Sequence, residues 1–401
     1  MKLFLPLFAI LALLTNALAE IKLPPHFSDH MVLQRDMKVP LWGTADPGEA
    51  ITVVLGKERA GTVADAKGKW SVQLEKLPAG GPHEMVITGS NQVTLRDVLV
   101  GEVWLCSGQS NMDFTVAKTA KRYFAGTANA AQEIAAGNHP AIRMFTSEWT
   151  MRDDPQPGVD GYWAVCSPDT VGDFSAVAYF FGRELQKGLK EKEGKTIPIG
   201  LITSAYGGST AEAWISRPAL EAHPELAGLV TEYGNKKKAY NSNGAVKEKY
   251  REAMRRWNEA AAKARTEGKP LPRAPKNPDP GEDQHNPSVL YNGMIAPLSP
   301  YAIRGVIWYQ GESNHPTADK YRLMMETLIA NWRGLFLSPE EKPFPFLFVQ
   351  LANYGKPSLL PGGRAALVRE AQLQTLALPN TAMVVAIDVG EAADIHPRNK
   401  Q

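Results

Sequence analysis

The serine at position 110 stands where a strand-like run gives way to small and polar residues. The stretch LCSGQSNMDF, residues 105–114, continues VLVGEVWL, whose valine, leucine and tryptophan content is typical of a buried strand. An α/β protein exposes side chains of this kind at the carboxyl edge of its sheet, where ligands bind. Ser110 is therefore either a nucleophile or the capping residue of the next helix.

Polar residues also follow three other strand-like segments. IPIGLITS leads to a turn with Gly207 and Gly208, GVIWYQ ends at Gln310, and AMVVAIDVG is followed by Asp394 and His396. Each signal is weak alone, since a serine before a helix is usually a cap and paired glycines usually form turns. Because all of them follow strands of one predicted sheet, we expect them to meet at one edge.

Acyl transfer requires this combination of groups. A serine hydroxyl is a poor nucleophile until a base takes its proton, and histidine, with an ordinary pKa near 6.5, suits that task. A carboxylate orients the imidazole, and N–H groups at glycine turns stabilise the oxyanion. The residues favour a serine hydrolase that uses no metal or other cofactor, and the sequence has no clustered cysteines.

The segments that position these residues alternate between apolar strands and amphipathic helices. This alternation predicts an α/β fold with a parallel sheet that is covered on both faces. The predicted strands are 103–106, 197–204, 305–310, 344–351 and 381–388, and the predicted helices are 175–189, 321–336 and 369–378.

Three further regions complete the predicted organisation. Residues 20–98 alternate apolar and polar residues between turn signals, which predicts a small antiparallel β-sandwich domain. The α/β domain then occupies residues 99–401. Within it, the segment near 236–280 is rich in Lys, Arg, Glu, Ala and Pro, which is typical of a solvated helical insertion.

Composition narrows the location and the partners of the protein. Residues 1–19 have one lysine, a short apolar run and an Ala-Leu-Ala end, which predicts a signal peptide and a secreted or periplasmic protein. No later apolar run approaches the length of a membrane span, and a net charge of +2 gives no field for nucleic acid. Cys106 and Cys166 are either buried hydrophobic residues or a disulfide pair.

Five blocks of the sequence resemble the sialate O-acetylesterase family of the SGNH hydrolase superfamily. The N-terminal HFSDHMVLQR and WGTADPGEAITV are also similar to the family's β-domain, so the likeness covers nearly all of residues 20–401. The five blocks are GQSNM (108–112), GGSTAEAW (207–214), PSVLYNGMIAPL (287–298), WYQGESN (308–314) and DIHPRNK (394–400).

The resemblance implies a three-layer, flavodoxin-like fold and a serine esterase that removes O-acetyl groups from carbohydrate, with sialic acid as the expected sugar. Acetylated xylan or another glycan is an alternative substrate, and a carbohydrate-binding protein without catalysis is an alternative of a different class. The resemblance also implies a closing helix after His396, so a sequence that ends at Gln401 is expected to be truncated.

Carried over by position, the resemblance makes Ser110 the nucleophile, His396 the general base and acid, and Asp394 the orienting acid. The superfamily usually places two residues between this acid and the histidine, whereas one residue separates them here. Asp388 and Glu391 are therefore alternative acids.

The resemblance also implies an oxyanion hole and a set of sugar contacts. The oxyanion donors are the backbone N–H of Ser110, the backbone of Gly208 (or Gly207) and the amide of Gln310, with Asn314 as an alternative to Gln310. The expected substrate contacts are polar residues of the same blocks, namely Asn111, Glu312, Asn314 and Asn292 with its neighbour Tyr291.

Overall fold

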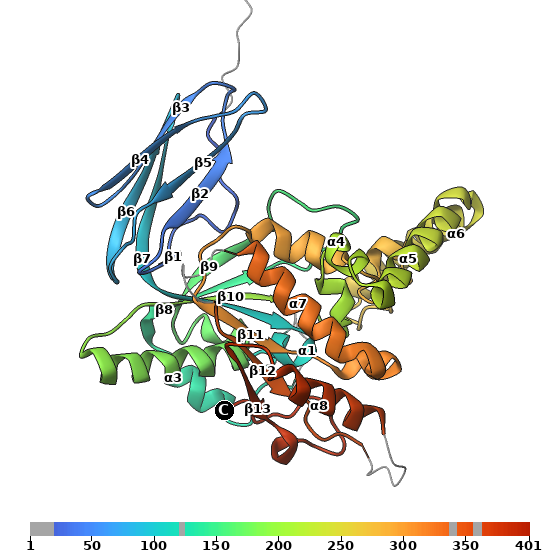
Figure 1. Cartoon of the computed structure of the whole chain (residues 1–401). Helices are drawn as coiled ribbons and strands as arrows, with labels where there is room; N and C mark the ends of the chain where they lie inside the picture. Colours follow the sequence, from blue (N-terminus) through green and yellow to red (C-terminus); the bar gives the residue numbers. More distant parts are fainter. Residues whose placement is uncertain (1–19, 120–124, 337–342, 356–362) are drawn as a thin grey trace, which may run out of the picture.

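The computed structural model describes residues 20–119, 125–336, 343–355 and 363–401, so the expected signal peptide lies outside the described residues. A mainly parallel sheet forms the centre of the molecule, and its strands lie in the order β13-β12-β11-β7-β10-β8-β9 (Figure 1). Only β9 runs antiparallel to its neighbour in this row. The strands are β7 (Gln92–Gly108), β8 (His139–Ser147), β9 (Gly161–Cys166), β10 (Ile199–Ala205), β11 (Gly305–Tyr309), β12 (Phe346–Gln350) and β13 (Thr381–Val385).

The parallel sheet confirms the predicted fold class, but its strand order differs from the expected one. In chain order the six parallel strands lie as 2-3-1-4-5-6, whereas flavodoxin-like sheets have the order 2-1-3-4-5. Strand β10 lies between β7 and β8, and all of its residues are buried, whereas β8 is partly exposed. Strand β8 was not predicted, because Pro140 and Arg143 interrupt its apolar run.

Helices cover both faces of this sheet (Figure 1). On one face, Tyr179 of α3 belongs to a core that includes Cys106 and Leu201, and on the other face Trp332 of α7 packs with Trp308 of β11. The predicted helices are confirmed, although α8 begins earlier than predicted. The helices are α1 (Ser110–Asp113), α2 (Ala130–Ala135), α3 (Ala176–Glu193), α4 (Arg217–Glu221), α5 (Pro224–Ser242), α6 (Gly244–Thr266), α7 (Tyr321–Leu335) and α8 (Arg364–Thr375).

Residues 20–98 contain strands and no α-helix. Strand β3 pairs antiparallel with β4 and β6, β2 pairs with β5, and β6 pairs with the first half of β7, which β1 joins in parallel. The expected boundary between residues 98 and 99 therefore falls inside the continuous strand β7. The strands are β1 (Val32–Gln34), β2 (Val39–Thr44), β3 (Ala50–Leu55), β4 (Glu58–Val63), β5 (Lys69–Leu74) and β6 (Gly80–Thr88).

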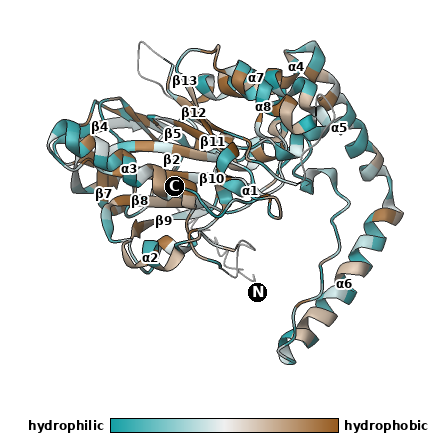
Figure 2. Cartoon of the chain, turned by 90° about the horizontal axis from the view of Figure 1, so that it is seen from below, coloured by the Kyte–Doolittle hydropathy of each residue, from teal (hydrophilic) through white to brown (hydrophobic). Residues whose placement is uncertain are grey.

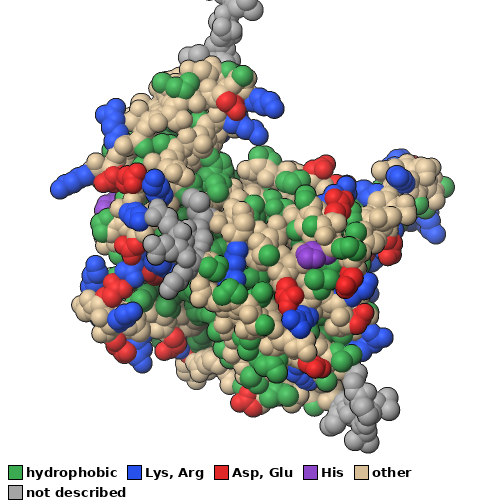
Figure 3. All heavy atoms as spheres, in the orientation of Figure 1, with side chains coloured by type: hydrophobic (Ala, Val, Ile, Leu, Met, Phe, Trp, Pro, Cys, Tyr) green, Lys and Arg blue, Asp and Glu red, His purple; other side chains and the backbone are tan. Residues whose placement is uncertain are grey.

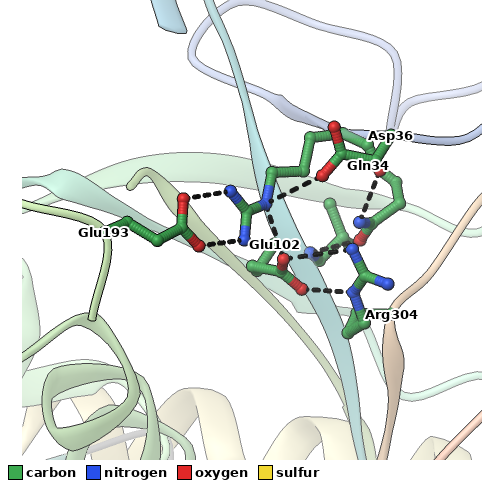
Figure 4. Close-up of polar contacts among 7 residues, drawn as sticks. Gln34, Asp36, Glu102, Glu193 and Arg304 are labelled. Atoms are coloured by element: carbon green, nitrogen blue, oxygen red, sulfur yellow. Dashed lines mark hydrogen bonds and ion pairs between the residues drawn. The ribbon is translucent and has the colours of Figure 1, made fainter. Parts of the chain in front are cut away.

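A charged cluster surrounds β7 where it passes from the N-terminal strands into the parallel sheet (Figure 4). The buried carboxylate of Glu102 accepts hydrogen bonds from Nε of Arg35 at 2.6 Å and Nε of Arg304 at 2.5 Å. Arg35 also donates two hydrogen bonds to Glu193, the last residue of α3. A buried charge is tolerated only when it is paired, so Glu102 depends on both arginines.

The two cysteines do not form a disulfide. Cys106 and Cys166 are both buried and free, so the disulfide alternative is wrong. Burial raises the pKa of both thiols, to about 12 for Cys166, which makes them unreactive hydrophobic residues. Separately, no helix of the described ranges has the length and apolar character needed to cross a bilayer.

Candidate active site

Ser110 begins α1 directly after β7, next to β11. The chain builds β8 and β10 on one side of β7 and then crosses to β11 on the other, so Ser110 lies at the topological switch point where ligands bind in such sheets. Gly108 has φ +141°, and a side chain there would collide with Tyr309. Gln109 is the capping residue of α1 and makes no side-chain cap bond, so the alternative of Ser110 as a cap is wrong.

The structure brings Ser110, His396 and Asp394 together. Nε2 of His396 lies 2.8 Å from Oγ of Ser110. Oδ1 of Asp394 accepts a hydrogen bond from the backbone N–H of His396 at 2.9 Å and lies 3.2 Å from its Nδ1. A proton on Nδ1 can thus be held by the carboxylate, which leaves Nε2 free to accept the hydroxyl proton of Ser110.

The surroundings of His396 favour its neutral form. Burial of the ring lowers its pKa, and the nearby positive charge of Lys400 acts in the same direction, while Asp394 opposes both effects. The pKa of His396 therefore lies below its usual value of 6.5. Only the neutral imidazole can act as a base, so the residue is ready for that role at neutral pH.

A cavity of about 460 Å³ opens over Ser110. Its volume falls in the range of ligand-binding pockets and leaves space for a sugar carrying an ester. The residues that line it come from the ends of several strands: Gln109, Ser110, Asp113, Trp149, Gly207, Gly208, Glu312, Ser313, Ile395 and His396.

Backbone N–H groups suited to an oxyanion lie beside Ser110. A Cβ at Gly207 would lie 3.6 Å from Cβ of Ser110, and Gly208 has φ +71°, which a glycine adopts without strain. Within the described ranges, the N–H groups of Ser110 and Gly208 donate to no protein acceptor. The turn can therefore supply donors to an oxygen atom bound at Ser110.

The expected oxyanion role of Gln310 is not supported by its geometry. This buried side chain donates from Nε2 to the backbone oxygen of Ser209 at 2.9 Å and to Oδ1 of Asn314 at 2.7 Å, so both amide hydrogens are used. The alternative, Asn314, is equally buried and donates to Glu212. Neither residue lines the cavity. Both amides instead hold the end of β11 against the turn that contains Gly208.

Gln109 is a lining residue that the sequence analysis missed. Its Oε1 accepts a hydrogen bond from the N–H of Gly311 at 3.2 Å, which fixes the orientation of the amide. No acceptor for its Nε2 is found in the described part of the chain, and the side chain lines the cavity beside Ser110. Its place directly before Ser110 in GQSNM was the available signal, but the direction of its amide depends on the loop after β11.

Asn111 holds the histidine loop against α1. Its Nδ2 donates to Oε1 of Glu312 at 2.7 Å and to the backbone oxygen of Ile395 at 3.2 Å, and its Oδ1 accepts from Nζ of Lys400 at 2.5 Å. Because Asn111 is fully buried and does not line the cavity, it positions His396 and does not contact substrate. Glu312 does line the cavity, and its burial raises its pKa.

Lys400 is a second residue that the sequence analysis missed. Its ammonium group lies 4.7 Å from the ring centre of Phe114 and 5.3 Å from that of Tyr309. Burial lowers its pKa to about 7, although the charge of Glu312 acts in the opposite direction. Lys400 thus places a charge that titrates near neutrality behind the histidine loop.

Asn292 does not reach the site. Its Nδ2 donates to the backbone oxygens of Arg152 and Asp153 at 3.1 and 2.8 Å, and neither Asn292 nor its buried neighbour Tyr291 lines the cavity. Asn292 instead anchors the segment that carries Trp149, which does line the cavity. The prediction that Asn292 contacts the sugar is therefore not supported, and Asn292 acts on the cavity only through the segment that it anchors.

Of the three candidate acids, Asp394 is the one placed on the His396 ring. Glu391 accepts a hydrogen bond from the N–H of Arg398 at 2.9 Å, and Asp388 lies in a short 3₁₀ helix, Ile387–Val389. In the described part of the chain, no group of three or more His, Cys, Asp or Glu is arranged to hold a metal ion.

The mixed α/β fold, with a large, mainly parallel sheet and this site at its carboxyl edge, is consistent with an SGNH-like esterase. Residues 100–268 and 282–400 match the family described as "Carbohydrate esterase, sialic acid-specific acetylesterase". The chain belongs to this family and is a carboxylic ester hydrolase.

Individual relatives agree with this assignment. The chain is 32% identical to the sialate O-acetylesterase of Rattus norvegicus, over 94% of this chain and 70% of that protein, and 32% identical to that of Homo sapiens, over 94% and 67%. It is similar to the crystal structure of a carbohydrate acetylesterase from Xanthomonas citri, with a TM-score of 0.71 and 34% identity over 95% of this chain and 72% of that one.

Proposed function

We propose that this esterase removes O-acetyl groups from carbohydrate, with sialic acid as the sugar that carries them. The distance of 2.8 Å between Nε2 of His396 and Oγ of Ser110 carries the proposal, because it provides a nucleophile with a base in contact. The names of the rat and human relatives support sialate as the substrate. The cavity over Ser110 provides the space for it.

In the proposed reaction, Oγ of Ser110 attacks the acetyl carbonyl while Nε2 of His396 takes its proton. The imidazolium then gives this proton to the sugar oxygen as the ester bond breaks, which leaves an acetyl group on Ser110. Water attacks this acetyl-enzyme with His396 again as the base, and acetate departs as Ser110 recovers its proton. Asp394 holds the imidazole and stabilises its charged form.

We assign the oxyanion hole to the N–H groups of Ser110 and Gly208 and to the amide of Gln109. These groups surround the cavity on the side of the nucleophile, and Nε2 of Gln109 is oriented by the bond that its Oε1 accepts from Gly311. Each donor of this kind typically contributes about 10²–10³ in rate, because it is already oriented before charge develops on the oxygen.

Acetate release from acetylated sialic acid and from acetylated xylan tests the proposal. Ser110→Ala should lose turnover of both esters and of a simple acetyl ester while its melting temperature stays near that of the wild type. Ser313→Ala is the matched control, because Ser313 also lines the cavity but is not the group bonded to His396. Full activity of Ser110→Ala would contradict the proposed mechanism, in which Ser110 is the nucleophile.

The same experiment separates the alternatives. Faster acetate release from acetylated xylan than from acetylated sialic acid would support the esterase activity but make xylan the substrate. Labelling of wild-type protein by a serine-directed phosphonate, and its loss in Ser110→Ala, would exclude a carbohydrate-binding protein without catalysis.

We also propose that residues 20–98 form an all-β sandwich domain, that residues 99–401 form a three-layer hydrolase domain, and that the protein is exported. The pairing of β2 with β5 and of β3 with β4 and β6 supports the first unit. The signal-like sequence of residues 1–19 supports export to a secreted or periplasmic location. N-terminal sequencing of protein recovered from outside the cytoplasm should begin after Ala19.

A further inference from the structure

A helical projection extends from the body of the molecule. Figures 1 and 2 show α6 standing away from the sheet, with the chain after it running back toward the body. We call residues 236–276 the basic arm, because they contain 13 Lys and Arg against 4 Glu, a net charge of +9. The whole chain has a net charge of +2, so the other residues together carry −7.

Part of this positive charge has no carboxylate partner among the residues that the structure describes. Arg255 is paired with Glu252 and Glu259 along α6, as in many solvated helices. Four exposed cations have no carboxylate partner within the described ranges, and they are distributed over the arm: Lys238, Lys249, Arg265 and Arg273. Figure 3 shows Lys and Arg side chains along the projection.

The base of the arm is joined to chain segments that lead to the cavity over Ser110. Lys237 pairs with Asp153 and Asp279, which fastens the arm to the segment that carries Trp149. The returning chain leads to Gln284, whose Nε2 would lie 3.4 Å from a Cβ at Gly208. A polymer lying along the arm would therefore approach the lining residues Trp149 and Gly208.

We propose that the basic arm binds an anionic polysaccharide and holds its acetylated sugars near the cavity over Ser110. This inference rests on the proposed function, since the ester must be part of the polymer that the arm binds. Carboxylates repeated along a polysaccharide match cations distributed along a helix, and the negative charge of the remaining residues favours binding at the arm.

The contacts of the arm favour a polysaccharide over a membrane. The indole N–H of Trp257 donates to the backbone oxygen of Pro272 at 2.9 Å, and Ala261 and Ala264 of α6 are buried. The returning chain therefore packs on α6 and takes up apolar surface that an interfacial helix would insert into lipid. The position of the base, beside the cavity of a carbohydrate esterase, favours a glycan over a nucleic acid.

Binding is measured with α2,8-linked polysialic acid as the probe and neutral dextran as its uncharged counterpart. The protein carries Ser110→Ala so that no ester is consumed. Glutamine at Lys238, Lys249, Arg265 and Arg273 should weaken binding of polysialic acid on the order of tenfold at low salt, since electrostatic attraction has this scale. Added salt should weaken binding by the parent protein more than by this arm variant.

A body variant with the same loss of charge is the matched control. Glutamine at the exposed residues Lys57, Arg59, Lys187 and Lys190, which lie outside the arm, should leave the affinity for polysialic acid unchanged. Equal affinity of the arm variant and its parent would overturn the proposal. Tighter binding of single-stranded DNA, or of phosphatidylglycerol vesicles, than of polysialic acid at the same salt would also overturn it.

Kinetics of the arm variant with Ser110 intact separate this inference from the proposed function. With acetylated polysialic acid the arm variant should show a higher KM and an unchanged kcat, and with p-nitrophenyl acetate both constants should stay at wild-type values. If the wild type turned over neither acetylated polysialic acid nor p-nitrophenyl acetate, the proposed function would be contradicted. Wild-type turnover with an unchanged KM in the arm variant would contradict the role of the arm alone.

Discussion

Nε2 of His396 lies 2.8 Å from Oγ of Ser110, although 286 positions separate the two residues in the chain. Ser110 follows the inner strand β7, whereas His396 follows β13, and β11 and β12 lie between these two strands in the sheet. The histidine loop therefore has to return across the carboxyl ends of β12 and β11. Hydrogen bonds from Asn111 to the backbone of Ile395, and from Lys400 to Asn111, fasten it there.

The environment of His396 predicts the pH dependence of the esterase. Protonation of the imidazole removes the base, and burial lowers its pKa, so kcat/KM for an acetyl ester should stay high down to a pH below 6.5 and fall below that point. Lys400→Met removes a charge that also lowers this pKa, so the acid limb should move to higher pH. Lys195→Met, which replaces an exposed lysine, is the control and should leave the pH profile unchanged. An unchanged profile in Lys400→Met would contradict the effect of Lys400 on the pKa of His396.

Asp394→Asn should lower kcat by about 10²–10⁴, because the imidazole loses the group that holds its tautomer and stabilises its charge. The carboxylate of Asp394 raises the pKa of His396, so the remaining activity should also have its acid limb at lower pH. Steady-state kinetics against pH measure both effects. Asp388→Asn is the matched control and should retain nearly full activity; a larger loss in this control would make Asp388 the orienting acid.

Gln109 and Gln310 should respond differently to substitution. Gln109→Glu keeps the oxygen that accepts from Gly311 but replaces the N–H donor, so kcat should fall by about 10²–10³ with little change in stability. Gln310→Met removes the donors to the backbone oxygen of Ser209 and to Oδ1 of Asn314. The oxygen of Asn314 still accepts from the N–H of Ala211, so the expected cost is about 1–3 kcal/mol of stability for the buried oxygen of Ser209.

Kinetics and thermal unfolding of the two glutamine variants measure the contrast. A loss of kcat in Gln310→Met at temperatures where it is folded, with normal activity of Gln109→Glu, would return the oxyanion role to Gln310.

Glu102→Gln should destabilise the protein strongly without changing the chemistry. The substitution leaves the guanidinium groups of Arg35 and Arg304 without the buried carboxylate that they share, and breaking such a network typically costs about 3–5 kcal/mol. The free energy of unfolding in urea measures this. Glu184→Gln, which removes an exposed partner of Arg183, is the control and should change stability by less than about 1 kcal/mol. Equal stability of both variants would contradict the role of the cluster.

Much of the fold and the central part of the site followed from local patterns. Apolar runs between helical segments predicted five of the six parallel strands, because a buried parallel strand needs apolar side chains on both faces. Strand β8 was missed because Arg143 interrupts its apolar run. The distant Asp97 balances the buried charge of Arg143, with a contact of 2.6 Å between Nη1 and Oδ2. The pattern of residues within one segment cannot identify an ion-pair partner that lies far away in the chain.

The sequence by itself determined which residues could do acyl chemistry, since Ser110, His396 and Asp394 are identified by residue type and by their positions after strands. Only the tertiary structure decided which amide faces the cavity and what lies behind the histidine. Gln109 is oriented by a backbone N–H beyond β11, and Lys400 is buried against α1 and β11. The direction of a side chain depends on the groups that packing brings to it, and those groups are hundreds of residues away in the chain.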